Sequence, residues 1–394
     1  MAEEWTILKA LEWTEQRLAR EGEGKNPRLA AQMLASHATG LTRIELYTNF
    51  DKPLTEDERA VLRESIQRRL NNEPLQYIIG HVGFRHLELA VRSPVLIPRP
   101  ETESLVELVI EYVANSEFLA KNRTCARDLA RKQELLAKNR SCALILARKV
   151  PNMVVFGNYG SDFGVFIKKP AKNRAQVQIL ARNLQKAAKN RAQVPLLATA
   201  QVDESCATQV NEPCATQFVQ VLDIGTGSGA IALSLLHELP DSKLYATDID
   251  EVAIVLASEN ASALKLDGEG HLKLLKDDLA SSFVADDSYH GYFDVVVSNP
   301  PYIPSAECDT LPAEILQHES RVALDGGVDG LEFIRRLAEQ AVSLLKPGGL
   351  LALELHELTT EGAADYVRTL PFRDIQIHKD LAKRHRFLTA IRDD

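Results

Sequence analysis

The chain contains no apolar run that approaches the roughly 18 residues a membrane-spanning helix requires. Its first residues, MAEEWTILKALEW, are acidic and helical in spacing, and they lack the basic segment and apolar core of a secretion signal. Of its 394 residues, 45% are hydrophobic and 26% are charged, which is ordinary for a globular protein. We therefore expect a soluble, cytoplasmic protein without membrane association, long enough for two or three domains.

Motifs that bind structural or catalytic metal ions are also missing. Neither a CxxC pair nor an HExxH motif occurs, and four of the five cysteines fall between residues 125 and 214. We predict no metal site, and we expect the thiols to be reduced and unpaired.

Positive charge is scarce outside one stretch of the chain. Residues 118–200 hold 17 Lys and Arg against 3 Asp and Glu, a surplus of 14, so with a total net charge of −9 the rest carries −23. Such an acidic body argues against tight, sequence-independent binding to nucleic acid, where neutralised phosphates supply most of the affinity. We expect no nucleic-acid substrate. No feature predicts an oligomer, so we expect a monomer.

The pattern before residue 117 predicts a helical domain and a short connecting segment. Residues 1–73 have apolar residues at helical spacing, with Pro27 suited to a first turn and Thr55 and Glu58 spaced as a capping box. Residues 74–116 contain LELAV, which alternates like a strand, and then PRPETESLVELVIEYV, which predicts a helix with acids near its start. We interpret them as a small helical bundle followed by a β-hairpin and a helix.

Residues 117–217 form an atypical basic insert. AKNR occurs at 120–123, 137–140, 171–174 and 188–191, at steps of 17, 34 and 17 residues. The shared letters are polar and the apolar ones vary, unlike solenoid repeats. We favour an inserted repeat of helical or disordered character, and a basic arm that contacts RNA is the alternative. Because loop closure depends only logarithmically on length, an insertion at the surface is compatible with the fold.

Strand and helix patterns alternate through residues 218–394, which indicates a mostly parallel sheet with right-handed crossovers. The last two strands are joined only by KDLAKRH and are expected to be an antiparallel pair. The predicted strands are QVLDI, KLYATD, HLKLL, FDVVVS, LLALEL, FRDIQIH and RFLTAI, and the predicted helices are IALSLLHEL, EVAIVLASENASALKL and GLEFIRRLAEQAVSLL.

Candidate ligand-binding residues fall at the ends of these strands. VLDIGTGSGAIALSLL, residues 221–236, runs from a strand through three glycines into a helix, which permits close approach of the backbone to a ligand. Asp248 ends the second strand, where an acid can accept hydrogen bonds from both hydroxyls of a ribose. Asp278 and Leu279 follow the third strand, where they can flank an adenine. The glycines alone could also form a tight turn with only a structural role. Ligand binding is favoured because all of these residues fall at the carboxyl ends of the strands, where open α/β sheets bind their ligands.

VVVSNPPYIP ends the fourth strand abruptly, because neither proline has an N–H to continue the ladder. The side chain of Asn299 and a neighbouring backbone carbonyl offer two acceptors, Pro300 and Pro301 stiffen the turn, and Tyr302 offers a flat face. Together they predict a clamp for a planar –NH₂ group. Placing the weak lone pair of such a nitrogen against an electrophilic methyl group is catalysis by orientation and electrostatics.

With GTGSG at 225–229, Asp248 and NPPY at 299–302, the chain resembles S-adenosylmethionine-dependent class I methyltransferases that act on planar amino nitrogens. PLQYIIG, LIPRPETE and EILQHESRVALDGGVDGL narrow the resemblance to release factor glutamine methyltransferases. The resemblance implies a Rossmann-like, mostly parallel α/β sheet with a C-terminal antiparallel strand, and an all-α N-terminal domain that contacts the substrate. It also implies methylation of the glutamine side chain in the Gly-Gly-Gln motif of class 1 peptide chain release factors.

The resemblance and the strand ends together assign the site. Asn299, Pro300, Pro301 and Tyr302 are expected to be catalytic and to hold the substrate amide. Arg99 and Glu101 are expected to bind the substrate at the border of the site, which Glu103 also adjoins. The chain departs from the family at Leu279, which is often aromatic in relatives, and at Lys383, where DLAGR has glycine. ELHELTTEG also replaces a stretch after the fifth strand that is usually rich in glycine. S-adenosyl-L-methionine is expected to contact Asp223, Gly225, Thr226, Gly227, Ser228, Gly229, Asp248, Asp278, Leu279 and Asn299.

Two other functions fit parts of the pattern. An adenine-N6 or guanine-N2 methyltransferase of DNA or RNA can use the same clamp, although the acidic body, the LIPRPETE block and the helical N-terminus disfavour it. An inactive interaction protein dominated by its insert belongs to a different class. These hypotheses are separated by measuring methyl transfer to a release factor, to the same factor with the glutamine changed to alanine, and to RNA.

Overall fold

The computed structural model describes residues 5–21, 26–115, 218–268 and 270–393. The predictions made for the insert at 117–217 lie outside the described residues. Residues 1–115 and 218–394 belong to one compact unit. Among the helices of the described residues, none is long and apolar enough to cross a membrane.

The N-terminal residues form a small helical bundle with its own core, as the apolar spacing predicts. Both predicted helix starts are confirmed. Pro27 lies in the first turn of α2, and Thr55 and Glu58 form a capping box at the start of α4. The helices are α1 (Ile7–Glu21), α2 (Pro27–Thr39), α3 (Arg43–Thr48) and α4 (Glu56–Leu70).

A short segment connects this bundle to the sheet. Helix α5 (Leu75–Ile79) leads into a hairpin of β1 (His81–Phe84) and β2 (Leu87–Ala90), and β2 alternates between buried and exposed side chains as LELAV predicts. Asn260, from the helix that follows β4, hydrogen-bonds both backbone groups of Ala90, at 2.8 and 3.1 Å, and the carbonyl of Ser228 at 2.9 Å. This buried amide ties the hairpin to the glycine-rich loop.

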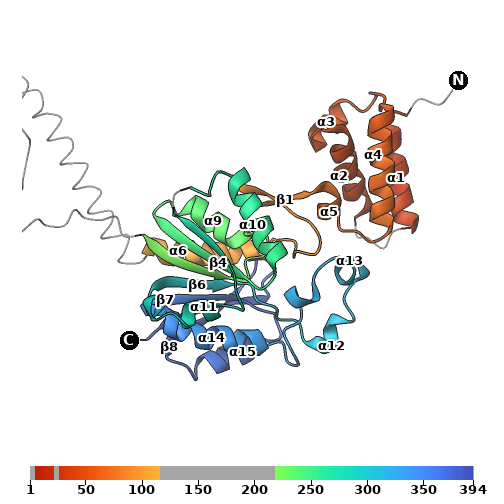
Figure 1. The fold of residues 1–394 in the computed structure, drawn as a ribbon. Coiled ribbons are helices and arrows are strands. Elements are labelled where there is room, and N and C mark those ends of the chain that lie inside the picture. Colours follow the sequence, from red (N-terminus) through yellow and green to blue (C-terminus); the bar gives the residue numbers. More distant parts are fainter. Residues whose placement is uncertain (1–4, 22–25, 116–217, 269, 394) are drawn as a thin grey trace, which may run out of the picture. The chain divides into compact units, whose positions relative to one another are not determined.

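The sheet has seven strands in the order β5-β4-β3-β6-β7-β9-β8 (Figure 1). The pairs from β5 to β7 are parallel, and β9 is antiparallel to both of its neighbours, so the predicted fold class and terminal antiparallel pair are confirmed. The strands are β3 (Val219–Ile224), β4 (Ser242–Asp248), β5 (Leu272–Lys276), β6 (Phe293–Ser298), β7 (Leu345–Glu354), β8 (Phe372–Lys379) and β9 (His385–Arg392).

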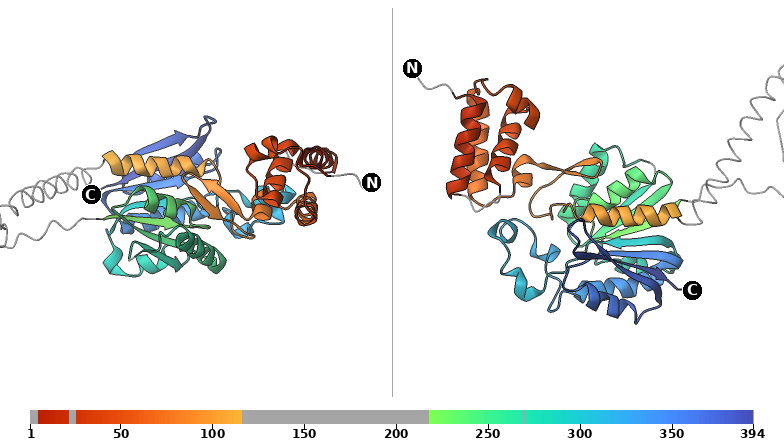
Figure 2. Two further views of the ribbon diagram at one scale, coloured as in Figure 1. Left: turned by 90° about the horizontal axis from the view of Figure 1, so that it is seen from above. Right: turned by 180° about the vertical axis from the view of Figure 1, so that it is seen from behind.

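Helices cover both faces of the sheet, which explains why β3 and β6 consist almost entirely of buried residues. The helix α6 lies on the same face as α9 and α10 (Figure 2), and α11, α14 and α15 cover the other face (Figure 1). Short helices α12, α13 and two 3₁₀ turns follow β5 and β6. The bounds are α6 (Thr102–Asn115), α9 (Ala230–Glu238), α10 (Glu251–Ala263), α11 (Ser281–Val284), Asp287–Tyr289, α12 (Ser305–Cys308), α13 (Ala313–Leu316), Arg321–Ala323, α14 (Glu332–Leu344) and α15 (Thr360–Val367).

One strand begins earlier than the sequence predicts. The pattern LLALEL places its start at Leu350, but β7 begins at Leu345 and includes the KPGG stretch, which reads as a turn. The register with β6 shifts there, and Lys346 donates to the Asp294 carboxylate of β6 at 2.7 Å, which holds the irregular stretch beside the sheet.

Candidate active site

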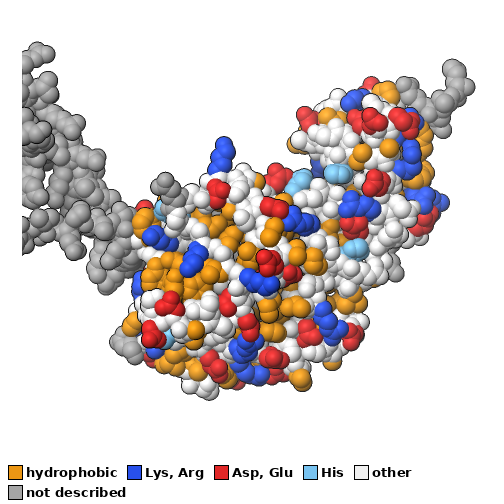
Figure 3. Space-filling model, in the orientation of Figure 1, with side chains coloured by type: hydrophobic (Ala, Val, Ile, Leu, Met, Phe, Trp, Pro, Cys, Tyr) orange, Lys and Arg blue, Asp and Glu red, His pale blue; other side chains and the backbone are white. Residues whose placement is uncertain are grey.

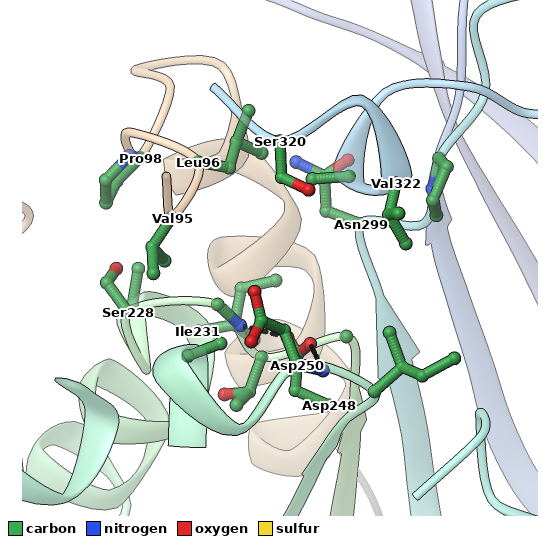
Figure 4. Close-up of a pocket in the computed structure, with 18 of the residues that line it drawn as sticks. Val95, Leu96, Pro98, Ser228, Ile231, Asp248, Asp250, Asn299, Ser320 and Val322 are labelled. Atoms are coloured by element: carbon green, nitrogen blue, oxygen red, sulfur yellow. Dashed lines mark hydrogen bonds between the residues drawn. The ribbon is translucent and has the colours of Figure 1, made fainter. Parts of the chain in front are cut away.

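A cavity lies over the carboxyl ends of β3, β4, β5 and β6, where the parallel topology brings the four predicted strand-end motifs together. In Figure 4, Ser228, Ile231, Asp248 and Asp250 line one side of it, and the segments that carry Val95–Pro98 and Ser320–Val322 lie across from them. Of the site residues predicted from the sequence, those that line this cavity are Arg99, Gly225, Thr226, Gly227, Ser228, Asp248, Asp278, Leu279, Asn299 and Pro301.

The glycine-rich loop after β3 has a backbone that few other residues adopt. Gly225, Gly227 and Gly229 have φ angles of 74°, 57° and 85°. The N–H groups of Gly225 and Thr226 donate to the carbonyl of Thr247 at 2.8 and 2.9 Å, which holds the loop against the end of β4. A Cβ on Gly229 would lie 3.0 Å from Leu233, so this glycine also permits close packing of α9.

Asp223 supports the loop from beneath. Its fully buried carboxylate accepts hydrogen bonds from the Thr226 hydroxyl at 2.7 Å and from the Ala232 N–H at 3.2 Å. The Oδ1 atom has no partner among the described residues. Burial raises the pKa of Asp223 to about 7. The predicted cofactor contact of Asp223 stays a prediction, because the side chain is not among the described residues that line the cavity.

Asp248 and Leu279 form the wall next to the loop. The Asp248 carboxylate accepts from the N–H groups of Gly227 at 2.8 Å and Asp250 at 2.9 Å, and each oxygen keeps a further lone pair for a ligand. Burial raises the pKa of Asp248. Leu279 has a φ of 55° and its carbonyl accepts from the Thr247 hydroxyl at 2.6 Å. Asp278 lines the cavity and pairs with Arg336 at 2.6 Å.

Two loops far apart in the sequence meet across the cavity. The N–H of Ser320 donates to the carbonyl of Pro94 at 2.9 Å, and the Ser93 hydroxyl donates to the carbonyl of His318 at 2.7 Å. Arg99 contacts both carboxylate oxygens of Glu319, at 2.6 and 2.8 Å, and the Glu319 side chain is only 1% exposed. The LIPRPETE and EILQHES blocks therefore hold each other in place.

The NPPY segment begins where β6 ends. The Ser298 hydroxyl donates to the carbonyl of Ile224 at 2.6 Å, which fixes the end of β6 against β3. The Asn299 side chain donates through Nδ2 to the Thr102 hydroxyl oxygen at 3.2 Å. Since the Nδ2 end of the carboxamide is used in this way, Oδ1 is the end that remains to accept a hydrogen bond from a ligand.

The DGGVDG segment, residues 325–330, packs tightly against the NPPY segment. A Cβ on Gly326 would lie 2.7 Å from Cα of Tyr302, and one on Gly330 would lie 2.5 Å from the carbonyl oxygen of Tyr302. Gly326 and Ile303 also share a backbone hydrogen bond of 2.8 Å. The glycines thus let a second backbone buttress the clamp.

The other predicted site residues lie near the cavity, but they are not among the described residues that line it. Glu101 pairs with Arg384 at 3.0 Å, and Glu103 accepts from the N–H of Arg85 at 3.1 Å. The ring of Tyr302 lies under the guanidinium of Arg386, at 5.7 Å from its centroid. Gly229 and Pro300 likewise lie outside the lining.

Sequence reasoning missed two buried residues beside the clamp, Thr102, which also lines the cavity, and Glu354. The Thr102 hydroxyl donates to Glu354 at 2.7 Å, and the Tyr302 hydroxyl donates to the other oxygen of Glu354 at 3.4 Å. Glu354 is fully buried, and burial raises its pKa to about 6. An acid inside the otherwise apolar strand LLALEL was the available signal.

Two family models and several relatives match the chain in sequence. Residues 9–80 match the PrmC N-terminal domain and residues 191–328 match the methyltransferase small domain. Release factor glutamine methyltransferases of Rhodopirellula baltica and Geobacter sulfurreducens are 30% and 31% identical to the chain, over 98% and 89% of it and 96% and 84% of the relatives. A solved methyltransferase of Pyrococcus furiosus is 21% identical, with a TM-score of 0.33, over 55% of this chain and 99% of that one.

Proposed function

Because the chain belongs to the release factor glutamine methyltransferase family, we propose that it transfers a methyl group from S-adenosylmethionine to the side-chain amide nitrogen of a glutamine. The proposed substrates are class 1 peptide chain release factors, and the proposed glutamine is that of their Gly-Gly-Gln motif. The observation that carries the proposal is the Asn299 carboxamide at the edge of the cavity, with its oxygen left to accept from a substrate –NH₂.

The cavity fits S-adenosylmethionine in the character of its lining. Gly225 and Gly227 bring backbone without a side chain to the cavity, and a Cβ on Gly225 would meet no atom of the described residues within 4 Å. Asp248 would accept from ribose hydroxyls, and Leu279 and Ile249 offer apolar surface for a base. When bound, the cofactor supplies an electrophilic methyl group on a sulfonium.

The chain's own contribution is to orient the substrate nitrogen. Asn299 Oδ1 and the neighbouring backbone carbonyl of the Pro-Pro turn would accept the two hydrogens of the amide. Holding both hydrogens fixes the plane of the amide and directs the nitrogen lone pair at the methyl group. The fixed dipoles also stabilise the positive charge that develops on the nitrogen as the carbon–nitrogen bond forms and the carbon–sulfur bond breaks. The nitrogen then releases one of its two hydrogens as a proton to solvent, which leaves a neutral methylated amide.

The electrostatics support a protein substrate over a nucleic acid. On the face shown in Figure 3, acidic and basic side chains are interspersed over the described residues. Of the residues that line the cavity, Arg99 is paired with the Glu319 carboxylate, and Asp278 is paired with the guanidinium of Arg336. Phosphate backbones need a row of available cations, which these pairs do not provide.

Transfer of labelled methyl from S-adenosylmethionine tests the proposal. The acceptors are a recombinant class 1 release factor, the same factor with the Gly-Gly-Gln glutamine changed to alanine, and RNA. We expect label in the wild-type factor, and none in the variant or in RNA. Labelling of RNA alone, or equal labelling of both factors, would overturn the proposal.

A further inference from the structure

Two side chains of the clamp, Asn299 and Tyr302, form one directional hydrogen-bonded network with two further buried side chains, Thr102 and Glu354. Asn299 donates to Thr102 at 3.2 Å, Thr102 donates to Glu354 at 2.7 Å, and Tyr302 donates to Glu354 at 3.4 Å. These residues come from the end of β6, the start of α6 and the end of β7. Thr102 and Glu354 are 4% and 0% exposed, so water does not compete for their bonds.

The direction of this network follows from the number of protons available. An ionised carboxylate only accepts hydrogen bonds, so the single proton of the Thr102 hydroxyl is directed to Glu354. The Thr102 oxygen can then only accept from its other neighbour, Asn299. If the Asn299 carboxamide turned its oxygen toward Thr102, that oxygen would face a lone pair of the Thr102 hydroxyl oxygen. With Nδ2 toward Thr102, the carboxamide instead donates a hydrogen bond. The buried carboxylate therefore determines which end of Asn299 faces the cavity.

We propose that Thr102 and Glu354 are positioning residues that hold the Asn299 carboxamide with its oxygen toward the substrate amide. The inference rests on the proposed function, because the orientation matters only when the substrate presents N–H donors. The opposite orientation would place an –NH₂ group against the substrate –NH₂, and the clamp would repel the group it is built to hold.

Protonation of Glu354 would remove this directional control. A carboxylic acid can itself donate to Thr102, which frees the hydroxyl proton to point at Asn299 and stabilises the turned carboxamide. The groups that face Glu354 are Thr102, Tyr302, the Arg386 charge, which lowers its pKa, and Glu101, which raises it. Glu101 is itself paired with Arg384. With burial as the largest cause, the pKa is about 6, so orientation is lost as the pH falls through that value.

Substitution of Thr102 separates orientation from packing. Thr102→Val keeps the shape and removes the hydroxyl, and we expect kcat for methylation of the release factor to fall roughly tenfold or more, with a smaller change in KM. Thr102→Ser restores the hydroxyl and should recover most of that loss. Thr14→Val is the matched control, because Thr14 is 1% exposed and its hydroxyl has no partner in the described part of the chain.

A pH profile gives a readout that packing alone does not change. At saturating cofactor, wild-type turnover should decline below about pH 6, and Glu354→Gln should lose this acid limb because its amide does not titrate. Asp223 titrates in a nearby range, so the limb is assigned by its disappearance in Glu354→Gln rather than by its midpoint. Binding of S-adenosylmethionine, measured by calorimetry, should stay within a few-fold in every variant and also reports folding.

The outcomes distinguish two failures. If the wild type does not methylate the release factor, the proposed function falls and the positioning role falls with it. If the wild type is active but Thr102→Val retains full turnover, or Glu354→Gln keeps the acid limb, only the positioning role is overturned. If Thr102→Val does not bind the cofactor, the positioning role is decided by two other results. These are the turnover of Thr102→Ser and the presence or absence of the acid limb in the pH profile of Glu354→Gln.

Discussion

At the scale of single residues, Lys383 occupies a backbone conformation that residues with a Cβ rarely adopt. Its φ is 66°, in the turn between β8 and β9, and its N–H donates to the carbonyl of Asp380 at 2.9 Å. The family resemblance places a glycine here, and glycine is the residue that tolerates this conformation. Lysine in place of the family's glycine therefore introduces local backbone strain in this turn.

We expect Lys383→Gly to stabilise the protein. Removing the Cβ relieves the left-handed strain, while glycine adds freedom to the unfolded chain, so the expected net gain is about 0.5–1 kcal/mol in the free energy of unfolding. Denaturant titration of both proteins measures it. Ala382→Gly is the control, because Ala382 is one residue earlier and has no positive φ, so this substitution should destabilise the protein. A loss of stability in Lys383→Gly would contradict the proposal that Lys383 is strained.

The residues of the site differ in how far the sequence could predict them. Asp248 and Asn299 are predictable from the sequence because Asp248 ends one recognisable strand and Asn299 directly follows another. Thr102 and Glu354 are 252 residues apart, and each has an ordinary local context, so their hydrogen bond follows only from the packing of α6 against β7. The proposed ligand contacts therefore have local patterns in the sequence, whereas the proposed positioning residues do not.

At the scale of elements, the DGGVDG segment acts as a support for the clamp. Its glycines leave room for the backbone of residues 301–303, and its backbone pairs with the same segment. In the sequence, the block has no local pattern beyond the family resemblance, and the structure supplies the physical reason for Gly326 and Gly330.

Gly326→Ala should therefore impair methyl transfer more than a mutation outside the cavity normally does. A Cβ at this position would lie 2.7 Å from Cα of Tyr302, and the backbone of the clamp must move to accommodate it. We expect turnover to fall roughly 10- to 100-fold and stability to fall by about 1–3 kcal/mol. Gly83→Ala is the control, since its Cβ would meet no atom of the described residues within 4 Å. Equal turnover in the two variants would contradict a supporting role.

The elements themselves were largely predictable. Six of the seven strands of the sheet lie within a residue or two of the predicted segments, because each is a short apolar or alternating run bounded by polar residues. The start of β7 was missed, because the KPGG stretch has the local signature of a turn while β6 and the Lys346–Asp294 ion pair hold it in the sheet. The order of the strands follows from crossover connections and not from any one segment.

At the scale of the whole molecule, the insert interrupts the chain between α6 and β3 without dividing their unit. Residues 1–115 and 218–394 form one compact unit although 102 residues separate them, from Ser116 to Gln217. The cavity and the clamp are built from residues on both sides of this interruption, as the contact of Thr102 with Glu354 shows.

Deletion of residues 118–217, with a short linker in their place, is expected to preserve folding, cofactor binding and methyl transfer. No residue of the cavity or the clamp described above is removed, and a shorter loop lowers the entropic cost of closure only slightly. Thermal unfolding and methyl transfer of the deletion variant and its parent are the measurements. A variant that is insoluble or inactive while the parent works would show that the insert is integral.

The central claim is that Asn299 holds a glutamine amide for methylation, and the most direct test measures turnover and cofactor affinity together in Asn299→Ala. We predict that methyl transfer to the release factor falls at least 100- to 1,000-fold, as for other fixed catalytic dipoles, while calorimetric affinity for S-adenosylmethionine changes less than about tenfold. Full turnover in Asn299→Ala would contradict the clamp and the account built on it.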